Sequence, residues 1–158
     1  MAGQATPATA LLVKQRVAHQ VHPYAVPADT PNYGAAVADA LGVPQERVFK
    51  TLVTEVDGSL VVAVVPVSGD VDLKALAAAV GGKRATLADR QVAERTTGYV
   101  RGGISPLGQR KALPTVVDSS ACAFDTIYVS AGRRGLQVEL APADLIRLTR
   151  ATQARISG

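Results

Sequence analysis

The segment VFKTLVTEVDGSLVVAVVPV, Val48–Val67, decides the fold. Two runs rich in β-branched residues flank Asp57-Gly58, a dipeptide that tolerates the positive φ angles of a two-residue turn. We therefore predict a β-hairpin. Its second run, Leu60–Val67, is the longest apolar stretch, but it contains Pro66 and is only strand-sized. It therefore predicts a buried strand and not a membrane segment.

Helices and further strands are expected on both sides of the hairpin. Capping signals and helical spacing predict helices beginning after Thr6 (and running to about His19), at Asn32 or Tyr33, after Asp72, at Ala88 and at Pro142. Short β-rich runs predict strands at Val21–Val26, Thr115–Val117, Thr126–Ser130 and Leu136–Leu140. Interleaved helices, strands and hairpins indicate an α+β fold around a mixed sheet or barrel.

The composition is that of one compact domain spanning residues 1–158, with flexible ends expected at 1–5 and 154–158. Hydrophobic residues make up 47% of the chain and aromatic residues only 4%, so the core is expected to consist mainly of Val, Leu and Ala. The formal charge of +4 permits a phosphate-bearing ligand but is too small to identify a nucleic-acid-binding protein.

Several classes of function lack support in the sequence. Cys122 is the only cysteine, and its spacing from His19 and His22 fits no zinc site, so neither a metal nor a cofactor is expected. A catalytic triad has few possible members, and the GxSxG motif is missing. Without a signal-peptide pattern or a membrane-spanning run, we expect a cytoplasmic protein with no membrane partner.

Lys50 lies in the first strand of the hairpin, on the face that strand alternation also gives to Val48, Leu52 and Val56. An inward ammonium group is costly unless it has a carboxylate partner, reaches the rim of the core or faces a polar ligand. A paired or snorkelling lysine and a ligand-binding lysine both fit this pattern.

A loop rich in Gly and Pro, GYVRGGISPLGQRKALP, spans Gly98–Pro114. Within it, Gly102–Gly108 could bring backbone N–H groups close to a phosphate or carbonyl oxygen. It matches neither the Walker motif nor the dinucleotide fingerprint, so a purely structural loop is equally open. The turn Ser130–Gly135, with Arg133 and Arg134, leaves the same choice between a solvated hairpin tip and a phosphate clamp.

Five short segments occur together in an order and spacing that match one family. They are FKTL at Phe49–Leu52, TGY at Thr97–Tyr99, GGISPLGQ at Gly102–Gln109, LPT at Leu113–Thr115 and IYVS at Ile127–Ser130. With them the chain resembles the YbaK/EbsC family of transfer-RNA editing domains from about Thr6 through the last helix. The resemblance implies a mixed, barrel-like β-sheet flanked by helices, and the activity of a Cys-tRNA(Pro) deacylase.

The resemblance also implies which residues form the site. The family lysine falls on Lys50, which is the expected catalytic residue. The implied substrate-binding residues are Tyr24, Thr51, Gly102, Gly103, Ile104, Ser105, Pro106 and Ser130. The candidate tRNA phosphate contacts, which could equally be solvated loop cations, are Arg101, Arg110, Lys111, Arg133 and Arg134. Taken from the sequence alone, Tyr24 is by default a packed ring.

Two positions depart from the family pattern. Gln137 stands where members often have an aspartate after the basic turn, and an amide can hydrogen-bond but cannot act as a base. Ala131 stands where a second glycine is common, which narrows the backbone conformations open to that turn.

The resemblance suggests that the thiol of a cysteinyl ester attacks its own carbonyl, with Lys50 and the N–H groups of Gly102–Ser105 stabilising the developing charge. The expected partners are the acceptor end of tRNA(Pro) and prolyl-tRNA synthetase. An Ala-tRNA(Pro) deacylase that uses water, and a non-catalytic module that binds an aminoacyl adenosine or a nucleotide, are the alternatives.

Overall fold

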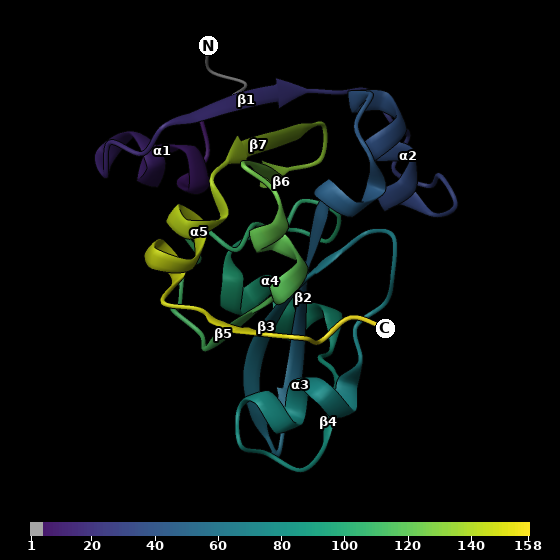
Figure 1. The fold of residues 1–158 in the computed structure, drawn as a ribbon, viewed down its shortest axis with the longest axis vertical. Helices are drawn as coiled ribbons and strands as arrows, with labels where there is room; N and C mark the ends of the chain where they lie inside the picture. Colours follow the sequence, from purple (N-terminus) through teal and green to yellow (C-terminus); the bar gives the residue numbers. More distant parts are fainter. Residues whose placement is uncertain (1–4) are drawn as a thin grey trace.

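The computed structural model describes residues 5–158, whose helices and strands alternate along the chain (Figure 1). The α-helices are α1 (Pro7–Lys14), α2 (Tyr33–Leu41), α3 (Leu73–Ala79), α4 (Arg90–Thr97) and α5 (Pro142–Thr149). The strands are β1 (His19–Pro23), β2 (Phe49–Val56), β3 (Ser59–Pro66), β4 (Ala85–Leu87), β5 (Thr115–Asp118), β6 (Ile127–Arg133), β7 (Leu136–Leu140) and β8 (Thr152–Ala154). The 3₁₀ helices are η2 (Gln45–Arg47) and η3 (Ser119–Ala123).

The strands form two sheets, which confirms the predicted α+β class with a mixed sheet. An antiparallel sheet has the order β1-β7-β6, and a five-stranded sheet has the order β4-β2-β3-β5-β8 with β5 parallel to both of its neighbours. Within residues 5–158 the strands do not close into a barrel, because β2 and β6 are not paired and only an isolated bridge joins Val48, just before β2, to Tyr128 of β6. The two sheets therefore abut without a continuous ladder of hydrogen bonds.

The predicted hairpin is β2–β3, paired from Phe49 with Pro66 to Val56 with Ser59. Its turn residues Asp57 and Gly58 have φ angles of 49° and 87°, as a two-residue turn of the Asp-Gly kind requires. Figure 1 shows this hairpin reaching away from the three-stranded sheet, with α3 and β4 near its far end.

The main core packs against one face of the three-stranded sheet. Side chains alternate across a strand, and Ile127, Val129 and Ala131 of β6 point into this core together with Leu136 and Val138 of β7. The intervening residues of both strands therefore face the other way. A separate apolar cluster joins β6 to α2 through Tyr128, Val37 and Ala38, so the second face of the sheet lies toward α2.

The two ends of the described chain differ from expectation. Helix α1 stops at Lys14 rather than near His19, because Arg16 adopts a φ of 56° and turns the chain into β1. Residues 154–158, expected to be flexible, begin at the last residue of β8, which pairs with β5, and Ile156 is fully buried. Of the expected flexible N-terminus, residues 1–4 lie outside the described residues and Ala5 is exposed. None of the helices in residues 5–158 is long and apolar enough to cross a bilayer.

Candidate functional site

A cavity of about 860 Å³ opens where α2, β2, α4 and the β6–β7 turn come together. Several sequence-predicted residues line this cavity. They are Lys50, Thr51, Arg101, Gly102, Ile104, Ser130 and Arg134. The fold thus brings residues from the hairpin, the glycine-rich loop and the basic turn to one hollow, although they are far apart in the sequence.

Lys50 enters the cavity wall from β2 with its side chain 33% exposed. Its Nζ lies 3.5 Å from Oδ1 of Asp70, whose own side chain is 97% exposed. An ion pair with so exposed a partner is worth little in water, so it does not hold the ammonium group firmly. Lys50 therefore both pairs with a carboxylate and lines the cavity, and these are the two possibilities that its strand pattern left open.

The buried part of the cavity wall combines apolar side chains, such as Phe49 and Val53, with two polar ones. Ser130 of β6 lies beside Gln137 of β7 in the strand register, and both line the cavity. The Ser130 hydroxyl accepts a hydrogen bond from the Gly132 N–H at 3.2 Å. Gln137 is only 6% exposed, and neither its Oε1 nor the buried Oγ1 of Thr51 has a hydrogen-bond partner in residues 5–158. Gln137 therefore lines the cavity as a residue whose amide oxygen is buried and unpaired within residues 5–158.

The glycine-rich loop contributes unequally to the cavity. Gly102 and Ile104 line it, whereas Gly103 does not. The Gly103 N–H donates to the Val100 carbonyl at 2.9 Å, so it is not available to a ligand as the predicted row of N–H donors required. Ser105 is fully buried, and its hydroxyl accepts a hydrogen bond from the Leu107 N–H at 3.2 Å. Gly103 and Ser105 therefore support the loop from its buried side and do not line the cavity.

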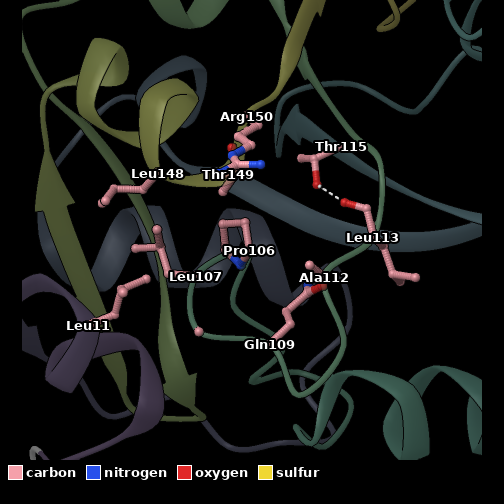
Figure 2. Close-up of a pocket in the computed structure, with 11 residues that line it drawn as sticks. Leu11, Pro106, Leu107, Gln109, Ala112, Leu113, Thr115, Leu148, Thr149 and Arg150 are labelled. Atoms are coloured by element: carbon pink, nitrogen blue, oxygen red, sulfur yellow. Dashed lines mark hydrogen bonds between the residues drawn. The ribbon is translucent and has the colours of Figure 1, made fainter.

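Pro106 lines a different, smaller cavity of about 220 Å³ between the glycine-rich loop, the middle of α1 and the C-terminal end of α5. Figure 2 shows Pro106 at the centre of this cavity, with Leu11 on one side and Leu113 on the other. The expected contact between Pro106 and the substrate is therefore not supported by its position. This side of the loop faces α5 instead.

Tyr24 does not line the cavity but lies behind a residue that does. Its hydroxyl lies 2.9 Å from the hydroxyl of Tyr33, and Tyr33 lines the cavity. Burial raises the pKa of Tyr33, and its hydrogen bond with Tyr24 raises it further, so Tyr33 remains a neutral phenol. Sequence reasoning missed Tyr33. A tyrosine at the first position of a helix, after Pro31-Asn32, carries no signal that distinguishes it from an ordinary packed ring.

Positive charge collects around the cavity. Lys50, Arg90, Arg101 and Arg134 line it, against the carboxylates of Asp29 and Glu94. Oε2 of Glu94 accepts the backbone N–H of Arg101 at 2.7 Å, and this hydrogen bond lowers the pKa of Glu94. Glu94 is therefore ionised at neutral pH and ties the glycine-rich loop to α4.

The other predicted cations lie outside this lining. The backbone N–H groups of Arg110 and Lys111 bond to the carbonyls of Thr97 and Thr96 at the end of α4. Arg133 is exposed, and its guanidinium donates to the carbonyl of Arg134 at 3.1 Å. Only Arg101 and Arg134 of the predicted tRNA contacts line the cavity.

Residues 28–148, which include every residue that lines the cavity, match the family of aminoacyl-tRNA editing domains. The chain belongs to this family. A protein of Enterococcus faecalis (strain ATCC 700802 / V583), named "Putative Cys-tRNA(Pro)/Cys-tRNA(Cys) deacylase EbsC", is 45% identical over 123 residues, 77% of this chain and 75% of that protein. The "Multifunctional Ser/Thr-tRNA deacylase ProXp-y" of Escherichia coli (strain K12) is 33% identical over 118 residues, 72% of this chain and 71% of that protein.

Solved structures carry the same fold. The crystal structure of a "putative trans-editing enzyme for prolyl tRNA synthetase" superposes with a TM-score of 0.82 at 22% identity, covering 98% of each chain. The editing-domain fold therefore extends beyond residues 28–148 to nearly the entire chain.

The cavity of this editing domain is lined by neither cysteine nor histidine. Cys122 lies elsewhere on the surface, with its Sγ 3.0 Å from Oε1 of Gln153. Residues 5–158 contain no cluster of three metal-ligating side chains. The ionisable groups that could act on a ligand in the cavity are therefore chiefly Lys50 and the arginines, which stabilise negative charge.

Proposed function

We propose that this editing domain is a cytoplasmic aminoacyl-tRNA deacylase that removes cysteine wrongly attached to tRNA(Pro). The observation that carries the proposal is a cavity that combines a buried wall of apolar and polar side chains with Lys50 and three arginines. Such a cavity suits an aminoacyl ester that is small at one end and carries phosphates at the other. The 45% identical relative, named as a Cys-tRNA(Pro)/Cys-tRNA(Cys) deacylase, supports this choice of substrate.

The substrate supplies the nucleophile in the mechanism that we propose. The sulfur of the cysteinyl group attacks its own ester carbonyl, so that a carbon–sulfur bond forms and the bond from that carbon to the ribose oxygen breaks. The thiol proton passes to the leaving ribose oxygen, and the tRNA departs with a free hydroxyl. A cavity wall that contains neither cysteine nor histidine fits this route, because no nucleophile from the protein is needed.

Lys50 is the catalytic residue in this proposal. Its ammonium group would bind the ester carbonyl or the adjacent terminal phosphate, where negative charge accumulates in the transition state. Backbone N–H groups of Gly102 and Ile104, the two residues of the Gly102–Ser105 segment that line the cavity, would add to this stabilisation. Ser130 and Tyr33 would shape the pocket around the cysteinyl group, and Tyr24 would hold Tyr33 in place.

Deacylation of three purified substrates tests the proposal. Cys-tRNA(Pro), Ala-tRNA(Pro) and Ser-tRNA are each mixed with wild type and with Lys50→Ala, and the loss of the aminoacyl bond is followed. Removing one charge-stabilising donor from an acyl-transfer site lowers the rate about 100- to 1000-fold, and we expect a loss of this size for cysteine. Lys74→Ala is the matched control, because Lys74 is an exposed lysine of α3 outside the cavity.

The outcomes separate the candidate functions. Loss of cysteine alone, dependent on Lys50, supports the proposal. Loss of alanine would favour attack by water, and binding of an aminoacyl adenosine without turnover would favour a non-catalytic module. We further propose that prolyl-tRNA synthetase provides the choice of tRNA, so adding it should increase the preference for tRNA(Pro) over other cysteinyl-tRNAs.

A further inference from the structure

Arg47 joins the two sheets beside the cavity but does not line it. It is the last residue of η2, and strand β2 begins two residues later at Phe49. The Nε of Arg47 donates to the backbone carbonyl of Thr126 at 3.1 Å, and its Nη2 donates to the Thr126 hydroxyl at 2.6 Å. Because Thr126 directly precedes β6, one guanidinium group attaches the start of β2 to the start of β6.

A carboxylate on the neighbouring strand β7 completes this attachment. Oε2 of Glu139 lies 3.5 Å from Nη2 of Arg47 and accepts a hydrogen bond from the Thr126 hydroxyl, and its Oε1 lies 2.9 Å from Nε2 of His22 in β1. The hydrogen bond from Thr126 lowers the pKa of Glu139, so the carboxylate is ionised at neutral pH. The guanidinium group also lies over the ring of Tyr128 in β6, 5.1 Å from its centroid. Residues of all three strands of this sheet therefore take part in the network.

The network lies next to the wall of the cavity. In the register of β6 and β7, Tyr128 pairs with Glu139, and Ser130 pairs with Gln137. Side chains two residues apart on a strand point to the same face, so these pairs form adjacent rows on one face of the sheet. Ser130 and Gln137 line the cavity, and Arg47 therefore binds one row away from its wall.

Lys50 enters the cavity from the other sheet, three residues after Arg47. Between them, Val48 forms an isolated bridge with Tyr128 instead of a continuous ladder of strand pairing. Apolar packing between the sheets is non-directional, whereas the planar fork of a guanidinium group fixes both the distance and the angle of its partners. The polar network thus gives the start of β2 a defined place on the three-stranded sheet.

Resting on the proposed role of Lys50, we propose that Arg47 is a positioning residue whose bonds to Thr126 and Glu139 place Lys50 relative to the cavity wall at Ser130. Arg47 does not line the cavity, so it acts on the reaction through Lys50. A small displacement of a catalytic group from its productive position costs about 100-fold in rate, even when the mutation lies away from the reacting atoms.

Deacylation of Cys-tRNA(Pro) by single and double variants tests this role. We expect Arg47→Ala to lower kcat about 100-fold and to change KM less than about twofold, because the phosphate contacts at the mouth of the cavity remain. In the Lys50→Ala background the same substitution should change kcat less than about twofold, because the group that Arg47 positions is gone. Arg147→Ala is the matched control, since it removes an exposed arginine of α5 and its ion pair with Asp144, and it should leave both constants unchanged.

Hydrogen exchange in the free protein provides a readout that does not depend on turnover. Backbone amides of residues 47–50 and 126–128 should exchange faster in Arg47→Ala than in wild type, as measured by mass spectrometry, and at the wild-type rate in Arg147→Ala. Arg47→Lys keeps the charge without the planar fork, so it should show the same effects at smaller size. It takes the place of Arg47→Ala if that variant does not fold.

A wild-type kcat in the Arg47 variants would overturn the inference. An equal loss of kcat in the wild-type and Lys50→Ala backgrounds would overturn it as well, because Arg47 would then act independently of Lys50. Unchanged exchange of both segments would show that Arg47 does not fix the two sheets. Faster exchange in the Arg47 variants, combined with no deacylation by wild type, would retain the attachment of the sheets and refute the proposed enzyme.

Discussion

Gly102 and Gly103 are adjacent residues with different physical roles. Gly102 has a φ of 86°, and a Cβ there would lie 2.4 Å from Nε of Arg134, the flexible end of a side chain. At Gly103, a Cβ would lie 2.6 Å from the backbone Cα of Arg133, which cannot move aside alone. Gly103 therefore lets the loop pack closely against the β6–β7 turn, whereas Gly102 lines the cavity.

We expect Gly103→Ala to destabilise the fold and to reduce deacylation, because the added methyl group displaces the loop from the backbone of the β6–β7 turn. Overpacking of this kind costs about 1–3 kcal/mol. Gly58→Ala is a useful comparison, since its φ of 87° brings strain of about 1–2 kcal/mol but its Cβ would meet open space. Urea unfolding and deacylation of both variants check this. Full activity of Gly103→Ala would contradict the assigned role.

At the scale of elements, the segment that follows the C-terminal strand β8 is fixed by one carboxylate. Asp118, at the end of β5, is buried, and its Oδ1 accepts the N–H groups of Ile156 at 2.8 Å and Ser157 at 2.9 Å. Its Oδ2 accepts from the hydroxyl and the N–H of Ser120 at the start of η3. Asp118 thus joins three elements, and it explains why residues 154–158 are packed rather than loose.

Asp118 gives the stability of the fold a defined dependence on pH. Burial on its own raises the pKa of Asp118, but the hydrogen bonds from Ser120, Ile156 and Ser157 outweigh it and hold the pKa below that of an ordinary aspartate. Because the folded pKa lies below the unfolded one, this contribution is complete above about pH 4 and is lost as the pH falls through the folded pKa.

We expect Asp118→Asn to lower the free energy of unfolding at pH 7 by about 1–3 kcal/mol, because one buried donor loses its acceptor. The variant should also lose less stability than wild type between pH 5 and pH 2. Urea denaturation across this range measures both effects, with the exposed Asp125→Asn as control. If the free energies of unfolding of wild type and Asp118→Asn fell in parallel between pH 5 and pH 2, Asp118 would not contribute in this way.

For the whole molecule, the distribution of charge matters more than its sum. The chain has a net charge of only +4, yet four cations and two carboxylates line one cavity. A local concentration of positive charge attracts phosphates and orients them, which a weak overall charge does not. Arg110 and Lys111, fixed by their backbone at the end of α4, lie outside this cavity lining.

We therefore expect Arg101→Ala combined with Arg134→Ala to weaken tRNA binding more than Arg110→Ala combined with Lys111→Ala. Each lost phosphate contact should reduce the slope of log affinity against log salt by about 0.7–0.9. Dissociation constants measured at several salt concentrations test this, with wild type as reference. Equal losses for the two pairs would place the tRNA over α4 as well as over the cavity.

Local features of the chain determine much of the fold. The Asp57-Gly58 turn fixes the β2–β3 hairpin, and the alternation in β6 and β7 fixes which side chains face the core, because turn type and side-chain period depend on neighbouring residues. Lys50 could be singled out for the same reason, as a charge on an apolar face. The GGISPLGQ segment at Gly102–Gln109 and its companions were sufficient to predict the family.

Only the tertiary structure decided which of these residues share a cavity. Tyr33, the unpaired oxygens of Gln137 and Thr51, and the packing of Gly103 on Arg133 all depend on contacts between segments that are distant in the sequence. Whether a buried polar atom has a partner is a property of its surroundings and not of its own residue type. The sequence determines which groups are present, and packing decides which of them remain open to a ligand.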